Sequence, residues 1–212
     1  MGHREQLLDA ARRLLVERGS ARITARDLVA ESGTNLASIG YHFGSKDALI
    51  NAAIESAFDE WSEQLASLVM SDPDATPIER GMATWLTALE TLPDRKHILQ
   101  AFVDSVAQAQ HVPELRAQLA AHYTKARGRV AALVALSLDD ETRADDPRCR
   151  AIAAFVISVC DGLALQWLID PDDSISSDEL RDGLLTVWTA SFGPDAMLRA
   201  PGRLAAKVSD PR

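Results

Sequence analysis

Residues 23–49, which read ITARDLVAESGTNLASIGYHFGSKDAL, decide the fold. They predict two short helices with a tight turn between them. Thr24 can cap the first helix, and Asp27 three residues later completes a capping-box pair. Gly33 ends that helix, and Thr34 is expected to cap the second, which begins at Asn35. Two short helices joined by a glycine-bearing turn are typical of the helix-turn-helix, whose second helix enters the major groove of DNA.

The second helix of this pair divides into two faces. Leu36, Ile39 and Phe43 stand at i, i+3 and i+7, so we expect them to pack on Leu28 and Val29. The other face carries hydrogen-bonding side chains that suit bases and phosphates. These are Asn35, Ser38 and His42, with Thr34 and Tyr41 beside them. A short helical hairpin also occurs in many all-α proteins, so this pattern alone leaves an ordinary helical core open.

The same stretch resembles the DNA-binding domain of the tetracycline-repressor (TetR) family. The resemblance rests on residues 23–33 and on the Tyr-His-Phe-x-Ser-Lys-x-x-Leu element at residues 41–49, and it covers about residues 4–54. It implies that Thr24 and Arg26 meet phosphates and that further side chains face bases or grip the flanking backbone. The base-facing set is Thr34, Asn35, Ala37 and Ser38, and the backbone-gripping set is Tyr41, His42 and Lys46. Gly40 departs from the family pattern, which often has an aromatic residue there.

The rest of the chain has helical periodicity throughout. With three short helices first and six long ones after them, it predicts an all-α fold. We expect a three-helix helix-turn-helix domain over residues 1–47 and a six-helix effector-binding and dimerisation domain over residues 48–193. Residues 194–212 have little periodicity, and we expect them to be disordered.

The last two predicted helices, at residues 147–169 and 177–192, are apolar on more than one side. Such helices are buried on more than one side, so we expect them to form a four-helix bundle between two subunits. A two-fold dimer would also double the DNA contacts of the small head. The expected interface residues are Val156, Val159, Leu163, Trp167, Leu184 and Trp188. An ordinary core within one chain is the alternative.

The middle helices carry candidates for a small-molecule pocket, because such pockets are mostly apolar with a few polar groups. The candidates are Met82, Trp85, Phe102, His122, Tyr123, Phe155 and Gln166. Each could equally be plain core. Asp104 and Asp161 lie inside apolar stretches and could meet a cationic ligand, although a surface charge or a contact between subunits explains them as well.

Composition limits the function classes. The net charge of −9 divides into about +1 for residues 1–50, with seven basic and six acidic side chains, and about −10 for the remainder, with 15 and 25. A neutral head can approach DNA phosphates although an acidic body repels them. We expect no membrane-spanning run, no disulfide between Cys149 and Cys160, and a cytoplasmic location. No nucleophile–base pair or metal-ligand spacing stands out, so we expect no catalytic residue, cofactor or metal.

The sequence therefore favours a homodimeric DNA-binding regulator. The leading hypothesis is a repressor that a small-molecule effector releases from a palindromic operator in double-stranded DNA. A transcriptional activator or a ligand-independent DNA-binding regulator is the first alternative, and a helical enzyme is the second.

Overall fold

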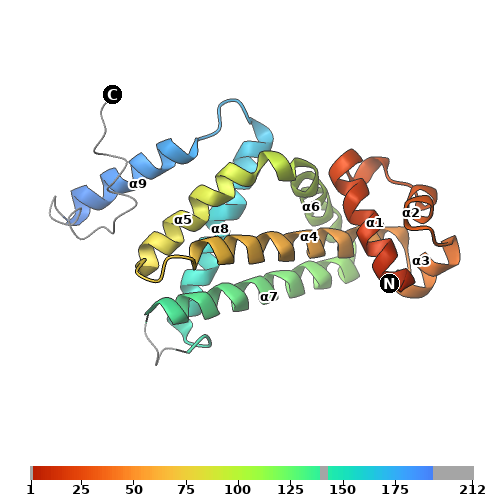
Figure 1. Ribbon diagram of the computed structural model, residues 1–212, viewed down its shortest axis with the longest axis horizontal. Helices are drawn as coiled ribbons and strands as arrows, with labels where there is room; N and C mark the ends of the chain where they lie inside the picture. The colour runs from red at the N-terminus through yellow and green to blue at the C-terminus, as the bar shows by residue number, and fades with distance from the viewer. Residues whose placement is uncertain (1, 139–142, 193–212) are drawn as a thin grey trace. The chain divides into compact units, whose positions relative to one another are not determined.

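The computed structural model describes residues 2–138 and 143–192. Over these ranges the chain is helical without a strand, as Figure 1 shows, so the predicted all-α class is confirmed. The predicted tail after residue 193 lies outside the described residues. The described helices are α1 (His3–Arg18), α2 (Ala25–Ser32), α3 (Leu36–Phe43), α4 (Lys46–Val69), α5 (Pro77–Thr91), α6 (Lys96–Ala109), α7 (Pro113–Leu138), α8 (Pro147–Ile169) and α9 (Ser177–Phe192), with 3-10 turns at Ser20–Arg22 and Pro93–Arg95.

The chain divides into two compact units. The first comprises residues up to 63 together with 93–126, and the second comprises residues 64–92 together with those from 127 onward. The helix-turn-helix therefore shares a unit with the first three quarters of α4, with α6 and with the first half of α7. The domain boundary that we predicted after residue 47 falls in the first turn of the continuous helix α4, and it stays a prediction.

The core of the first unit joins the helix-turn-helix to α4. Leu7, Leu14 and Leu28 are fully buried in α1 and α2, and α4 adds a stripe with helical spacing. That stripe is Leu49, Ile50, Ala53 and Ile54. Burial of each leucine stabilises the unit by roughly 1.5–3 kcal/mol relative to leaving it exposed. Because these residues form one cluster, the start of α4 is anchored in the same core as the DNA-reading helices.

Two ion pairs also hold α4 within this unit. Arg12 of α1 pairs with Glu60 of α4, and Lys125 of α7 pairs with Asp59 of α4. Exposed pairs of this kind each contribute about 0–1 kcal/mol. They fix which side of α4 faces each neighbour more than they add to stability.

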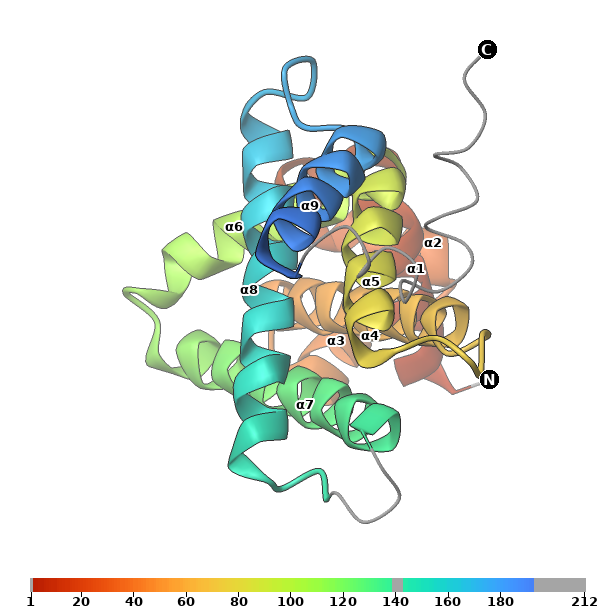
Figure 2. The same ribbon diagram turned by 90° about the vertical axis from the view of Figure 1, so that its left-hand side faces the viewer.

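In the second unit, α5 packs against both α8 and α9, and Figure 2 shows α5 and α9 side by side. The indole Nε1 of Trp85 donates a hydrogen bond to the carbonyl of Val156 at 3.3 Å, and the ring of Trp85 meets Phe155 edge-on with centroids 5.8 Å apart. Cys149 and Cys160 are free thiols in α8, as expected from their spacing. Burial, with a smaller effect from the charge of Asp161, raises the pKa of the Cys160 thiol to about 12.

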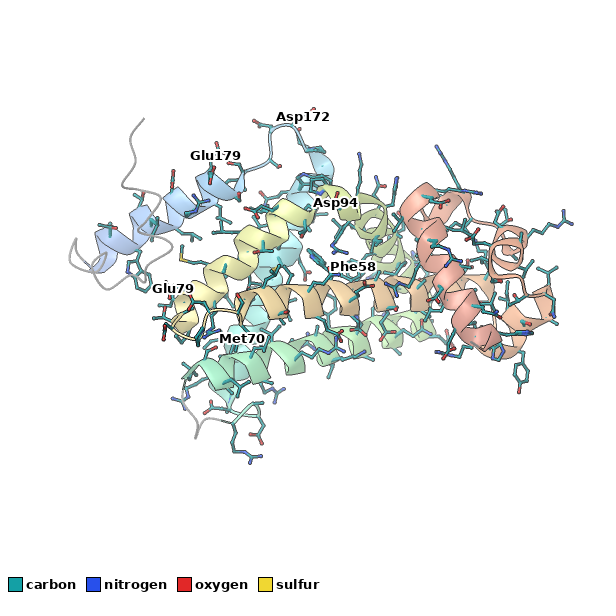
Figure 3. All side chains as sticks on the ribbon, viewed as in Figure 1. Phe58, Met70, Glu79, Asp94, Asp172 and Glu179 are labelled. Carbon is teal, nitrogen blue, oxygen red and sulfur yellow. The ribbon has the colours of Figure 1, made fainter. Side chains whose placement is uncertain are left out.

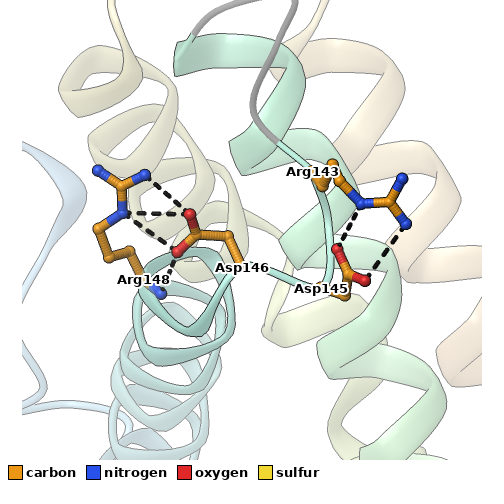
Figure 4. Close-up of polar contacts among 4 residues, drawn as sticks. All are labelled: Arg143, Asp145, Asp146 and Arg148. Carbon is orange, nitrogen blue, oxygen red and sulfur yellow. Dashed lines mark hydrogen bonds and ion pairs between the residues drawn. The ribbon is translucent and has the colours of Figure 1, made fainter.

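The start of α8 is fixed by a polar turn (Figure 4). The Asp146 carboxylate accepts a hydrogen bond from the backbone N–H of Arg148 at 2.7 Å and pairs with the guanidinium of the same residue. Arg143 and Asp145 form a second ion pair beside it. The hydrogen bonds from Arg148 lower the pKa of Asp146. Pro147 then occupies the first helical position, where its missing N–H costs nothing.

One expectation about composition was wrong. We expected no stretch apolar enough to cross a membrane, but within the described ranges α8 passes that test by length and composition. Isolated polar residues such as Asp161 interrupt its apolar run, but the mean hydropathy of the helix stays high enough for a membrane span. Only 17% of the apolar stretch is buried inside a single chain. Such a helix requires another apolar surface to cover it.

Candidate nucleic-acid interface

The candidate reader is the helix-turn-helix formed by α2 and α3, and the predicted capping box holds the start of α2. Thr24 Oγ1 accepts a hydrogen bond from the backbone N–H of Asp27 at 3.2 Å, and the Asp27 carboxylate accepts the backbone N–H and the hydroxyl of Thr24 at 2.8 and 2.6 Å. These bonds, that of the hydroxyl first, lower the pKa of Asp27. The hydroxyl of Thr24 is thus already engaged, and its predicted phosphate contact would have to compete with Asp27.

The turn between α2 and α3 needs a glycine. Gly33 has a φ of 65° and a ψ of 24°, the left-handed conformation in which a side chain is strained. The hydroxyls of Ser32 and Thr34 share a hydrogen bond of 2.8 Å across this turn. We predicted Thr34 as the cap of α3, and this prediction was wrong. Asn35 is the cap, and its Oδ1 accepts the backbone N–H of Ser38 at 3.0 Å.

The outer face of α3 differs from the prediction at two positions. Leu36, which we expected in the core, is 55% exposed at the first position of the helix. Ser38, which we expected to face bases, is only 7% exposed and lies on the core side with Ile39. Its hydroxyl is satisfied there by Asn35 Oδ1 at 3.2 Å and by the ring Nδ1 of His3 at 3.3 Å.

The side chains that α3 does present form one stripe. The exposed positions are Leu36, Ala37, Gly40 and Tyr41, which follow i, i+1, i+4 and i+5 spacing. Tyr41 is 85% exposed, and the half-buried ring of His42 meets it edge-on at 4.8 Å. A Cβ at Gly40 would meet no atom within 4 Å, so nothing in the described chain requires a glycine there. An apolar side chain such as Leu36 suits a thymine methyl group.

The junction from α3 to α4 places a cation beside this stripe. Gly44 turns the chain with a φ of 82°, and the Ser45 hydroxyl accepts the backbone N–H of Ala48 at 3.0 Å. Lys46 then reaches the carbonyl of Ile23 at 3.4 Å and the carboxylate of Asp47 at 3.2 Å. Lys46 therefore links the start of α4 to Ile23, which lies just before α2. Helix N-termini add partial positive charge at such a place.

The ion pairs around the helix-turn-helix do not involve the exposed arginine of α2. Arg13 pairs with Glu31 at 2.8 Å, and Arg18 lies 3.7 Å from Asp27. Arg26 is exposed on α2 and has no ion-pair partner within residues 2–138 and 143–192. A guanidinium in that state can bind a phosphate without first breaking a salt bridge.

The predicted dimer residues are all half-buried within one chain. They are Val156, Val159, Leu163, Trp167, Leu184 and Trp188. The apolar side chains left most exposed on α8 are others, which share a different side of the helix. Leu165 is 48% exposed and Ile169 is 77% exposed, with Phe155 on the same side. Val187 is the exposed counterpart on α9.

The predicted pocket residues divide between the two units. Met82, Trp85, Phe155 and Gln166 belong to the second unit. In the first unit, Phe102 and His122 line a cavity of about 120 Å³ between α4, α6 and α7, and Tyr123 contacts both rings. Sequence reasoning missed the share of α4, which supplies Asn51, Glu55 and Phe58. Their i, i+4, i+7 spacing was the available signal.

Two family models match the chain. The model described as "Bacterial regulatory proteins, tetR family" matches residues 7–53, and the model "BetI-type transcriptional repressor, C-terminal" matches residues 77–192. Their matched ranges contain the candidate reader and the helices α5 to α9, respectively.

Several individual proteins are similar over most of their length. The nicotine-responsive transcriptional repressor of Paenarthrobacter nicotinovorans is 25% identical over 192 residues, which cover 90% of this chain and 95% of that protein. Among solved structures, a regulator of Rhodococcus sp. RHA1 matches with a TM-score of 0.68 at 16% identity, covering 96% and 99% of the two chains. The multidrug binding protein EbrR, complexed with imidazole, matches with a TM-score of 0.58 at 25% identity, covering 87% and 88%.

Proposed function

Because the chain belongs to the TetR family of transcriptional regulators, we propose that it is a homodimeric repressor which a small-molecule effector releases from a palindromic operator. The chain is a regulator and not an enzyme. The observation that carries the proposal is the exposed stripe of α3, which a core shared with α4 holds at the surface. Because its proposed partner is DNA, we propose that it acts in the cytoplasm.

In the proposed complex α3 lies in the major groove. Asn35, Ala37 and Gly40 would approach base edges, while Tyr41, His42, Lys46 and Arg26 would bind the phosphates on either side. Three predicted contact residues would act mainly by holding the turns and helix ends in place, namely Thr24, Thr34 and Ser38. Direct contacts of these residues with DNA would be secondary. Gly40 would let the helix backbone come close to the bases, because it adds no side chain to the exposed stripe.

The homodimer would form through α8 and α9. The apolar side of α8 with Leu165 and Ile169 is not covered by any other described part of the chain, and a second copy of the same helix is a covering surface of the same chemistry. The predicted residues Val156, Val159, Leu163, Trp167, Leu184 and Trp188 would pack beneath this contact. Two recognition helices would then meet two half-sites about one helical turn of DNA apart.

The similar proteins support an organic nitrogen base or cation as the effector. One relative is nicotine-responsive, and similar structures hold imidazole, proflavin or choline. Each of these molecules carries a basic or quaternary nitrogen. We extend that chemical class to this chain, whose acidic side chains outnumber its basic ones by 31 to 22.

A promoter–reporter assay tests the regulatory part of the proposal. The operator, selected from random DNA, is placed over a promoter in cells with and without the protein. We expect lower reporter output with the protein, and recovery when an organic amine is supplied. Higher output with the protein would show an activator and overturn the proposed repression.

Replacing Asn35 should separate its capping role from base reading. Asn35→Ser keeps a capping oxygen, so the free energy of unfolding should change by only a few tenths of a kcal/mol, while Asn35→Ala should cost about 1 kcal/mol. Both should change which operator sequence is preferred, because both remove the carboxamide. Gel shifts on matched and scrambled duplexes, with thermal unfolding in parallel, measure the two effects. Equal losses on both duplexes would exclude Asn35 from base reading.

A further inference from the structure

We propose that the cationic nitrogen of the effector binds in the cavity of the first unit, with the Glu55 carboxylate as its counter-charge. This inference rests on the proposed function, because it places the effector of that function. The effector site would then lie in the same compact unit as the helix-turn-helix. The cavity lies between the first three turns of α4 and the helices α6 and α7.

The cavity has a polar wall built from two helices. Ser105 of α6 is buried, and its hydroxyl donates to the Ala101 carbonyl at 2.8 Å and also lies 3.1 Å from Asn51 Oδ1 of α4. The Asn51 carboxamide thus lies beside the Ser105 hydroxyl and is a further polar group of the wall. Ala48 and Ala52 line the cavity on either side of Asn51 in the sequence, and their small side chains leave room for a ligand.

Another part of the lining is aromatic. The rings of Phe58 and Phe102 lie 5.0 Å apart, and the ring of His122 lies 5.8 Å from Phe58 and 6.4 Å from Phe102. Figure 3 shows Phe58 projecting from α4 toward α6. Aromatic rings attract organic cations through their quadrupoles and give an apolar ligand ring a surface to pack on.

Glu55 is the only carboxylate that lines the cavity, and no cation pairs with it in the described parts of the chain. Its acidic neighbours on α4 differ, because Asp59 pairs with Lys125 and Glu60 pairs with Arg12. Glu55 is exposed at the cavity mouth, one turn from both Asn51 and Phe58. A ligand with its apolar part against the rings would therefore bring a positive group to an uncompensated negative charge.

The size of the cavity restricts the ligand to about one ring with a short arm. Its volume of about 120 Å³ is a little below the ~150 Å³ of an engineered cavity that holds benzene. The chemical class is therefore a small aryl or alkyl amine with a single cationic nitrogen. Gln118 and Leu119 of α7 complete the lining on that side.

The site is placed to influence DNA binding. The face of α4 opposite to Glu55 carries Leu49, Ile50 and Ala53, which belong to the core of the helix-turn-helix. The same helix begins at Lys46, two residues before the first lining residue, Ala48. A ligand between α4 and α7 would displace the helix whose first turn borders the DNA-reading face.

Three probes of similar shape test the site on the full chain: benzylamine, benzyl alcohol and benzoate. Dissociation constants come from ligand-observed NMR titrations of the wild type, Glu55→Gln and Glu63→Gln. Glu63 is the matched control, an exposed glutamate on the same helix that does not line the cavity. We expect benzylamine to bind about tenfold more tightly than benzyl alcohol, and benzoate to bind weakest. Glu55→Gln should remove most of the amine preference and leave only the small part that the aromatic rings provide, and Glu63→Gln should keep it in full.

Ala52→Leu provides a second test, because a larger side chain should fill the cavity and weaken both benzylamine and benzyl alcohol. Circular dichroism checks that each variant keeps its helices. An amine preference that Glu55→Gln does not reduce, or no preference in the wild type, would overturn this inference. Operator binding of the same samples without probe is measured separately. A protein that binds no operator would overturn the proposed function instead, so the two failures are distinguishable.

Discussion

Leu165→Glu should split the protein into monomers that keep their helices and lose operator binding by at least about 100-fold. By symmetry the substitution would place two carboxylates in the proposed interface, and each buried unpaired charge costs roughly 3–5 kcal/mol. A monomer would contact a single half-site, and the second set of contacts would be lost. Light scattering gives the mass, circular dichroism the helix content, and a gel shift the affinity.

Leu136→Glu is the matched control for this prediction. Leu136 is an exposed leucine on α7, and the proposed interface does not include that helix. The Leu136→Glu protein should stay dimeric and bind the operator as the wild type does. If instead Leu165→Glu leaves the mass at that of a dimer, the exposed side of α8 is not the interface.

Tyr41→Ala should weaken binding to matched and scrambled duplexes by the same factor, about tenfold. Tyr41 is 85% exposed, so its removal disturbs little packing, while a hydrogen bond from its hydroxyl to a charged phosphate is worth about 1.5 kcal/mol. Tyr41→Phe removes that hydroxyl alone and should account for most of the loss. A loss confined to the matched duplex would assign Tyr41 to base reading.

Lys46→Gln belongs to the same prediction, because it removes a charge and keeps a donor for the Ile23 carbonyl. The slope of log affinity against log salt concentration should become shallower by about 1, which is the contribution of one phosphate contact. Fluorescence anisotropy at several salt concentrations measures the slope. An unchanged slope would mean that Lys46 serves only to hold the start of α4.

Local chemistry made the helix-turn-helix predictable. Thr24 and Asp27 form the capping box that their spacing indicates, and Gly33 has the left-handed conformation that ends α2. The start of α3 was predicted one residue early because Thr34 and Asn35 both have capping side chains. The choice between them depends on the Ser32 hydroxyl, which engages Thr34. Periodicity could not show this side-chain competition.

Tertiary packing explains the larger errors. Ser38 takes a buried position because His3 and Asn35 satisfy its hydroxyl, and His3 is 35 residues away along the chain. The cavity draws on α4, α6 and α7, so only Phe102 and His122 were recognised as pocket candidates that line it. The sequence analysis did not single out Glu55, because the sequence does not show that the nearby acids Asp59 and Glu60 have partners.

The central claim is that two copies of α3 read a duplex together, and selection from a pool of random DNA duplexes at low ionic strength tests it most directly. The account predicts an enriched motif with two-fold symmetry, its half-site centres separated by about one helical turn or a multiple of it. Failure to enrich any sequence, or enrichment of a single asymmetric site, would contradict it.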